Sequence, residues 1–293
     1  MNTTYTVTTD SPSKISVESH LIYVLWMQGR AYAGFEAEFE VKTILVGDGS
    51  IVKVTCRTAK GKKLGKVEGA TALNRYRGKV LIPESVGPDD YLYLEAELPK
   101  HGLKGESNLI PVRPPLEVTS MRWDKTKIYR DETAHLECTF VNGVEDGDRA
   151  MVLIFEYDPD GGHDLIVKIP VEISNGKVAL DWKFEYQGET GSLSTEYELN
   201  AYQKNYRNPE YFFMVAVENI RVGNRQESGL LTFREKLHLQ VSDAYGIIMK
   251  NEDFEVLFAD GVTRNYTSDD KGFINDDSIS PGKFFVAHVD KEE

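Results

Sequence analysis

The chain has 293 residues, of which 41% are hydrophobic and 28% charged, which predicts a folded protein of two or three domains. Its formal net charge of −13 argues against nucleic acid as a partner, because an acidic surface repels phosphate backbones. The longest apolar run, residues 21–27, is too short for a membrane span, which takes about 20 residues.

The start of the chain, residues 1–7, is polar and lacks the basic and apolar parts of a secretory signal. We therefore expect assembly in the cytoplasm, or export by a route without a standard signal, as part of a larger particle. Residues 1–14 are predicted to form a flexible arm. Cys56 and Cys138 lie in β-like stretches and are expected to be buried free thiols, in agreement with a reducing compartment.

Short runs of alternating apolar and polar residues follow along the whole chain, for example 35–41, 91–98, 178–184 and 237–241. This period of two is the pattern of half-buried strands, and turn-forming Gly, Asp, Asn and Pro residues separate the runs. No long stretch has the helical period of 3.6. The sequence therefore predicts an all-β fold.

An internal repeat divides most of the chain into two copies. Three matches occur in one order at a nearly constant separation: Trp26 with Trp123, 97 positions apart; Asp48-Gly49 with Asp146-Gly147, 98 apart; and Gly78 with Gly176, 98 apart. The second copy is longer, with an insertion predicted near residues 187–193. Each copy has the size of an immunoglobulin-like β-sandwich, in which Trp26 and Trp123 are expected to fill the core.

These matches predict immunoglobulin-like sandwiches over residues 15–112 and 115–228, joined by the stiff segment Pro111–Pro115. A small β-module over residues 230–293 completes the chain. Four stretches of it carry turn and strand signals: Asp243 to Gly246, Phe254 to Gly261, Ser268 to Phe273, and Ile279 to Phe284.

The order of those four stretches resembles small prealbumin-like or carboxypeptidase-regulatory-like β-modules. Modules of this kind are attached to spike and baseplate proteins of contractile injection systems, including type VI secretion. The second copy, with Trp182 and residues 208–213, looks like the β-sandwich that precedes such tails. The resemblance covers roughly residues 115–293, and it implies a structural role among other protein subunits.

The best metal candidate is the acidic, glycine-rich loop that holds Asp158, Asp160 and Asp164, because calcium takes oxygen ligands. An ordinary hairpin tip explains the same residues. The six histidines share no metal-ligand spacing, and the chain has no nucleophile-elbow motif. We therefore predict no catalytic residues and no cofactor.

Two further stretches are candidates for contact with other proteins. Lys62 and Lys63 lie in the basic run Lys60–Lys66, which either meets an acidic partner or forms an exposed hairpin tip. The same place in the second copy is the acidic loop, so opposite tips could join neighbouring subunits head to tail. Tyr211, Phe212 and Phe213 either anchor an interface or pack inside the protein.

These features predict a non-enzymatic structural or adaptor component of a large assembly, most consistent with a contractile injection system. One alternative is a subunit of an extracellular filament or adhesin-like fibre, in which residues 2–9 donate a strand to the next subunit. Another is a carbohydrate-binding accessory protein, which needs exposed coplanar aromatic rings. The expected partners are other protein subunits, including further copies of this chain.

Overall fold

The computed structural model describes residues 16–88, 90–185 and 208–289, which form β-strands joined by turns and one short 3₁₀ helix, η1 (Pro99–His101). The predicted all-β fold is confirmed. The chain divides into two compact units, the first extending to Leu116 with Glu218–Ile220 added, and the second holding the rest. Within the described part of the chain, no helix has the length and apolar character needed to cross a bilayer.

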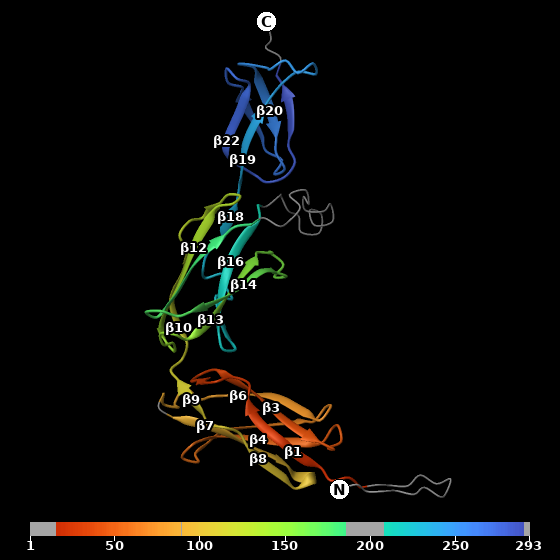
Figure 1. The fold of residues 1–293 in the computed structure, drawn as a ribbon, viewed down its shortest axis with the longest axis vertical. Helices are drawn as coiled ribbons and strands as arrows, with labels where there is room; N and C mark the ends of the chain where they lie inside the picture. Colours follow the sequence, from red (N-terminus) through yellow and green to blue (C-terminus); the bar gives the residue numbers. More distant parts are fainter. Residues whose placement is uncertain (1–15, 89, 186–207, 290–293) are drawn as a thin grey trace, which may run out of the picture. The chain divides into compact units, whose positions relative to one another are not determined.

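The first unit contains a sandwich of two sheets (Figure 1). The smaller sheet has the strand order β1 (His20–Trp26), β3 (Glu36–Ile44), β6 (Arg75–Leu81). The larger sheet has the order β2 (Ala31–Tyr32), β9 (Ile110–Arg113), β7 (Tyr91–Leu98), β4 (Ile51–Thr58), β5 (Lys63–Ala70), with β8 (Leu103–Glu106) also paired to β7. Only β2 and β9 pair in parallel among these strands.

The second sandwich repeats this arrangement strand for strand. Its smaller sheet has the order β10 (Glu117–Trp123), β12 (Thr133–Asn142), β15 (Lys177–Lys183). Its larger sheet has the order β11 (Lys127–Ile128), β18 (Leu231–Phe233), β16 (Glu210–Val217), β13 (Arg149–Glu156), β14 (Asp164–Glu172), with β17 (Ile220–Val222) paired to β16. The strands of this larger sheet that come first and last along the chain again pair in parallel, β11 with β18. Two immunoglobulin-like sandwiches in tandem are therefore present.

Tryptophans fill the space between the sheets in both sandwiches, as the sequence predicted. Trp26 and Trp123 are 5% and 8% exposed. Trp123 packs against Trp182 and Phe213, with ring centroids 5.7 and 5.1 Å away. Cys56 and Cys138 are buried free thiols, and burial raises the pKa of each to about 12.

Strand register corrects one match of the repeat. Gly78 pairs with Phe39, whereas the equivalent pair in the second sandwich is Leu180 with Leu136, so Gly78 corresponds to Leu180 and not to Gly176. Gly176 corresponds instead to Asn74, and both close tight turns with positive φ, +67° and +60°. Asn and Gly both tolerate that conformation, so the glycine match was a coincidence of turn chemistry.

The sequence separation between equivalent residues of the two sandwiches changes at the hairpin tip between β13 and β14. Arg57 pairs with Lys63 across the tip of the first sandwich, while Phe155 pairs with Leu165 across the tip of the second, which is four residues longer. The insertion predicted near residues 187–193 lies outside the described residues.

Glycines let a large ring pack inside the first sandwich where the second uses two smaller side chains. A Cβ atom on Gly69 of β5 would overlap the ring of Tyr76 on β6. By register, the counterparts of Gly69 and Tyr76 are Val171 and Val178. The two sandwiches thus fill equivalent space with different pairs of residues.

The remaining strands form the C-terminal β-module: β19 (Glu235–Gln240) pairs with β22 (Phe273–Ile279), and a second sheet has the order β21 (Thr263–Thr267), β20 (Asp253–Leu257), β23 (Phe285–His288). Asp243 and Asp269 each begin a similar turn. The Oδ1 atom of each accepts hydrogen bonds from the backbone N–H groups two and four residues later. The glycine three residues after each aspartate has positive φ, which explains the Asp-x-x-Gly pattern in the sequence.

Candidate interface on the second sandwich

The larger sheet of each sandwich has one face on the core and one outer face. The strand registers show that the outer positions of the two sheets correspond one for one. For example, the cross-strand pair Lys53–Glu97 in the first sandwich corresponds to the pair Met151–Ala216 in the second. The charged sheet face of the first sandwich consists of Lys53, Thr55, Arg57, Tyr93, Glu95 and Glu97. The apolar sheet face of the second sandwich consists of Met151, Leu153, Phe155, Phe212, Met214 and Ala216.

The apolar sheet face is partly covered within the chain. Leu153, Phe212 and Met214 at its centre are buried, while its other members are only half-buried. The rings of Phe155 and Phe212 stack across the two strands, with centroids 5.5 Å apart. Leu165 on β14 lies beside Phe155 and is 42% exposed, so the face extends to the edge of the sheet.

The longer hairpin tip folds against one end of this face. The ring of His163 stacks on Tyr157 and meets Phe212 edge-on, with centroids 5.2 and 4.9 Å away. Its Nδ1 atom accepts a hydrogen bond from the N–H of Asp158 at 3.0 Å, which holds the ring in place. With Phe155 stacked on it and His163 against its edge, Phe212 is fully buried, whereas its counterpart Tyr93 in the first sandwich is half-buried.

The same tip carries the carboxylates predicted as calcium ligands. Gly161 N–H donates to the carbonyl oxygen of Asp158 at 3.0 Å, and Gly162 N–H donates to Asp160 Oδ1 at 2.8 Å, so the loop is an ordered turn. Burial raises the pKa of the Glu156 carboxyl, and the nearby charges of Asp158 and Asp164 raise it further. Among the described residues, no group of three or more His, Cys, Asp or Glu side chains is placed to hold a metal; calcium binding here stays a prediction.

The three aromatic interface candidates fall on different faces of β16. Tyr211 and Phe213 point into the core, where Tyr211 packs on Trp182 at 5.7 Å and Phe213 on Trp123. Phe212 alone belongs to the outer face. Because side chains alternate along a strand, Phe212 lies on the outer face while Tyr211 and Phe213 belong to the core. A role for Phe212 in an interface stays a prediction.

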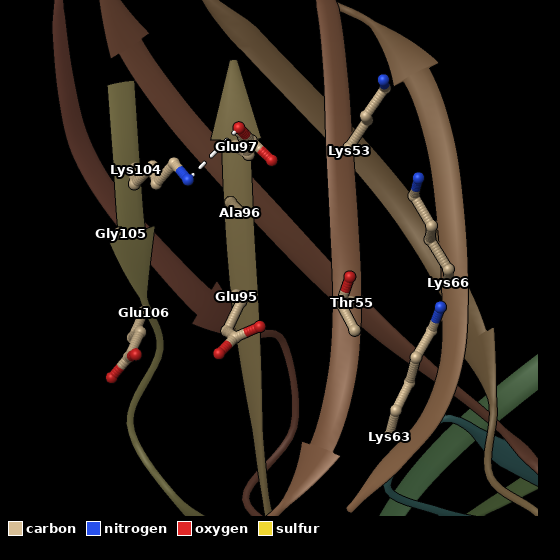
Figure 2. Close-up of a pocket in the computed structure, with 10 residues that line it drawn as sticks. All are labelled: Lys53, Thr55, Lys63, Lys66, Glu95, Ala96, Glu97, Lys104, Gly105 and Glu106. Carbon is tan, nitrogen blue, oxygen red and sulfur yellow. Dashed lines mark ion pairs between the residues drawn. The ribbon is translucent and has the colours of Figure 1, made fainter. Parts of the chain in front are cut away.

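The charged sheet face forms one side of an open hollow of 660 Å³, which Figure 2 shows with its lining residues. Two of its acids are paired: Glu95 with Arg57 at 2.5 Å, and Glu97 with Lys104 at 3.4 Å. The predicted interface residue Lys63 lines the hollow, while its neighbour Lys62 lies in the hairpin tip, where its N–H donates to Thr58 Oγ1 at 3.2 Å.

Reasoning from the sequence missed the contrast between the two sheet faces, as well as Lys53, which joins Lys63 and Lys66 of the predicted basic run in the hollow. The signal was present. At the separation of 98 already found from the Asp-Gly turns, Lys53, Thr55 and Arg57 align with Met151, Leu153 and Phe155. A comparison of outward positions between the aligned copies would have revealed a charged strand matched to an apolar one.

One serine–histidine contact was also not foreseen. Ser50 Oγ lies 3.0 Å from Nε2 of His101, next to the 3₁₀ helix of the first sandwich. A hydrolytic triad adds an acid that orients the histidine through its other ring nitrogen. Of the described carboxylates, none is hydrogen-bonded to His101, so the described residues do not complete a triad around this pair.

Comparisons with known proteins place the chain in no family: no family model and no curated protein matches it. Among solved structures it is similar to a tetra-tandem repeat from the extending region of a large adhesion protein, with 11% identity, a TM-score of 0.26, and coverage of 90% of this chain and 66% of that one. It is also similar to the ICAM-5 D1–D4 ectodomain fragment, with 10% identity, a TM-score of 0.30, and coverage of 93% and 75%.

A third similar structure is the FN1–FN3 segment of chicken CNTN1, with 11% identity, a TM-score of 0.32, and coverage of 72% of this chain and 61% of that one. The chain thus spans slightly less than two thirds of the first and third of these structures. Because the identities and TM-scores are low, the fold assignment rests on the strand order and register described above.

Proposed function

We propose that this protein is a non-enzymatic structural or adaptor component of a larger protein assembly, and that it binds another subunit through the apolar sheet face. The observation that carries the proposal is that charged and polar residues on the sheet of the first sandwich correspond, position for position, to apolar residues on the equivalent sheet of the second. The half-buried members Met151 and Phe155 and the exposed Leu165 leave apolar surface at the edge of the face. Apolar patches of this kind on a folded domain are typical of interaction sites.

The setting that we propose is a contractile injection particle. The turn pattern of the C-terminal β-module, built on Asp243 and Asp269, supports this setting through its resemblance to modules attached to spike and baseplate proteins. In a filament or adhesin-like fibre, the alternative setting, the subunit bound by the apolar sheet face is another copy of the chain.

The test transfers residues from one sandwich to the other. Met151→Lys combined with Phe155→Arg gives the second sandwich the residues that the first carries at the equivalent positions. Both sites are half-buried, so long charged side chains can reach water while their aliphatic parts pack on the sheet. We expect the tagged wild-type chain, purified from its native source, to retain partner subunits that the double variant loses.

The matched control is Arg57→Phe combined with Glu95→Met, which places two apolar side chains on the charged sheet face of the first sandwich without touching its lysines and should keep every partner. Mass spectrometry of the retained subunits separates the settings: spike or baseplate proteins indicate an injection particle, and only further copies of the chain indicate a filament. If the folded Met151→Lys/Phe155→Arg variant retains all the partners of the wild type, the proposal is wrong.

A further inference from the structure

The hollow on the first sandwich contains three lysines that form no ion pair with any described residue. Lys53 on β4 and Lys63 and Lys66 on β5 stand along one side of it, and we call them the lysine column (Figure 2). Among the described residues, no carboxylate lies within ion-pair distance of these three ammonium groups, and the Glu95 and Glu97 side chains of the hollow pair with Arg57 and Lys104 instead. Lys60 at the nearby tip is separate, since it reaches Asp90 at 3.9 Å.

The lining of the hollow carries four lysines and three glutamates, a small positive excess on a chain with a net charge of −13. Its ligand should be acidic, and the overall charge of the protein disfavours a polyanion such as nucleic acid. An acidic protein loop fits better, because only a local segment of it has to approach the hollow. The opening is broad, so a turn of polypeptide can enter where a deep pocket would exclude it.

The chain itself supplies such a loop, at the tip of the equivalent hairpin in the second sandwich. This acidic tip consists of Glu156, Asp158, Asp160 and Asp164. No lysine or arginine of the described residues forms an ion pair with Glu156 or Asp164. Burial raises the pKa of Glu156, and the charges of Asp158 and Asp164 raise it further. Asp160 and Asp164 are exposed, and the turn that presents them is ordered by its own hydrogen bonds.

We propose that the lysine column of one copy binds the acidic tip of a second copy, so that chains associate head to tail. The two surfaces lie on different sandwiches and differ from each other, so the contact is heterologous. Repetition of a heterologous contact gives a closed ring or an open filament. This proposal names a partner for a surface other than the apolar sheet face, and each can be tested without the other.

The experiment measures self-association of the purified full-length chain by sedimentation velocity, over a concentration series at about 50 mM salt, where surface charge is weakly screened. One variant, Lys63→Glu/Lys66→Glu, reverses the column, and the other, Asp158→Lys/Asp164→Lys, reverses the tip. Each variant alone brings like charges together, and we expect at least a tenfold weaker association than for the wild type. An equimolar mixture of the two variants should associate again, because every contact in it joins opposite charges.

The matched control is Lys250→Glu/Lys271→Glu, which changes the net charge by the same amount as Lys63→Glu/Lys66→Glu but uses exposed lysines of the C-terminal β-module. It should associate as the wild type does. The proposal is overturned if the wild type stays monomeric at low salt, if its association does not depend on concentration, or if mixing the two reversed variants fails to restore it. Association through the apolar sheet face does not depend on these charges, so the loss in each reversed variant and its recovery in the mixture report only the contact between the column and the tip.

Discussion

The two sandwiches have the same strand order, but the outer face of the larger sheet is mainly charged in the first and apolar in the second. On the core side the equivalent residues of β4 and β13 are apolar in both copies: Val54 corresponds to Val152, and Cys56 to Ile154. On the outer side a Lys-Thr-Arg series corresponds to a Met-Leu-Phe series. Packing between the sheets requires apolar residues at the core positions of both copies. The outer positions have no such requirement, so their residues can differ with what each face contacts.

An apolar outer face stabilises the fold only where its side chains are buried. Removing a large apolar side chain from water is worth about 1.5–3 kcal/mol, and leaving it in water forfeits that gain. In the second sandwich, Leu153, Phe212 and Met214 obtain this stabilisation. In the first sandwich, the position equivalent to Met214 holds Glu95, whose ion pair with Arg57 is weakened by solvent and is worth about 0–1 kcal/mol.

The largest expected effect comes from giving the buried face a charge. Met214 corresponds to Glu95 and is 8% exposed, so Met214→Glu places an unpaired carboxylate among Leu153 and Phe212. Burial of an unpaired charge is costly, and we expect a loss of about 3 kcal/mol or more in the stability of the second sandwich. Urea unfolding followed by the fluorescence of Trp123 and Trp182, in a Trp26→Phe background, measures it.

The reciprocal change, Glu95→Met, is the control for that experiment. It removes the exposed ion pair with Arg57, and we expect a loss of less than about 1 kcal/mol in the first sandwich. An equal effect of the two substitutions would mean that the faces do not differ in burial.

A smaller effect is expected from exchanging the packing of β5. Gly69→Val adds a side chain where the Tyr76 ring lies, and overpacking of this kind costs about 1–3 kcal/mol. The double variant Gly69→Val/Tyr76→Val reproduces the pair found in the second sandwich and should recover part of that loss, because the ring that clashes is gone. Unfolding followed by Trp26 fluorescence measures both; additive losses would contradict complementary packing.

The smallest effect concerns pH. Glu156 corresponds to Thr58, and its pKa in the folded state is raised above the ordinary 4.5. The folded state therefore binds the proton more tightly than the unfolded state, so stability falls as pH rises through the folded pKa. We expect Glu156→Thr to stabilise the second sandwich at neutral pH, with the gain disappearing as pH falls to about 4.5 and below.

Glu40 provides a control of opposite sign. A hydrogen bond from Tyr23 and an ion pair with Arg77 hold the pKa of Glu40 below its ordinary value. Its contribution is present above the unfolded pKa and is lost in acid, so Glu40→Gln should destabilise the first sandwich at neutral pH and have no effect at low pH. Thermal unfolding at several pH values compares the two; the same sign for both would refute the assignment.

The sequence predicted the fold class and the repeat because these depend on local signals. The alternation of strands, the two tryptophans and the Asp-Gly turns are each visible in a few neighbouring residues. The register after the hairpin tip was not predictable in the same way. Asn74 and Gly176 satisfy one backbone requirement with different residues, and a match of letters misses that equivalence.

The candidate interface was only partly predictable. The apolar run 211–217 indicated a strand covered on both sides, but the sequence did not say what lies on each side. That Phe212 meets His163 depends on a hairpin folding back across the sheet, and that three lysines line one hollow depends on the pairing of β4 with β5. These contacts join residues from separate strands and require the register to be known first.

The parallel pairing of the first and last strands of each larger sheet, β2 with β9 and β11 with β18, has a mechanical consequence. In the first sandwich the N–H of Ala33 donates to the carbonyl of Arg113, and in the second the N–H of Thr232 donates to Thr126 and that of Arg234 to Ile128. Tension that draws the two ends of a sandwich apart pulls these parallel strands in opposite directions and loads the bonds between them in shear. They must then break together, whereas a zipper opens one bond at a time, so each sandwich is built to resist stretching along the chain.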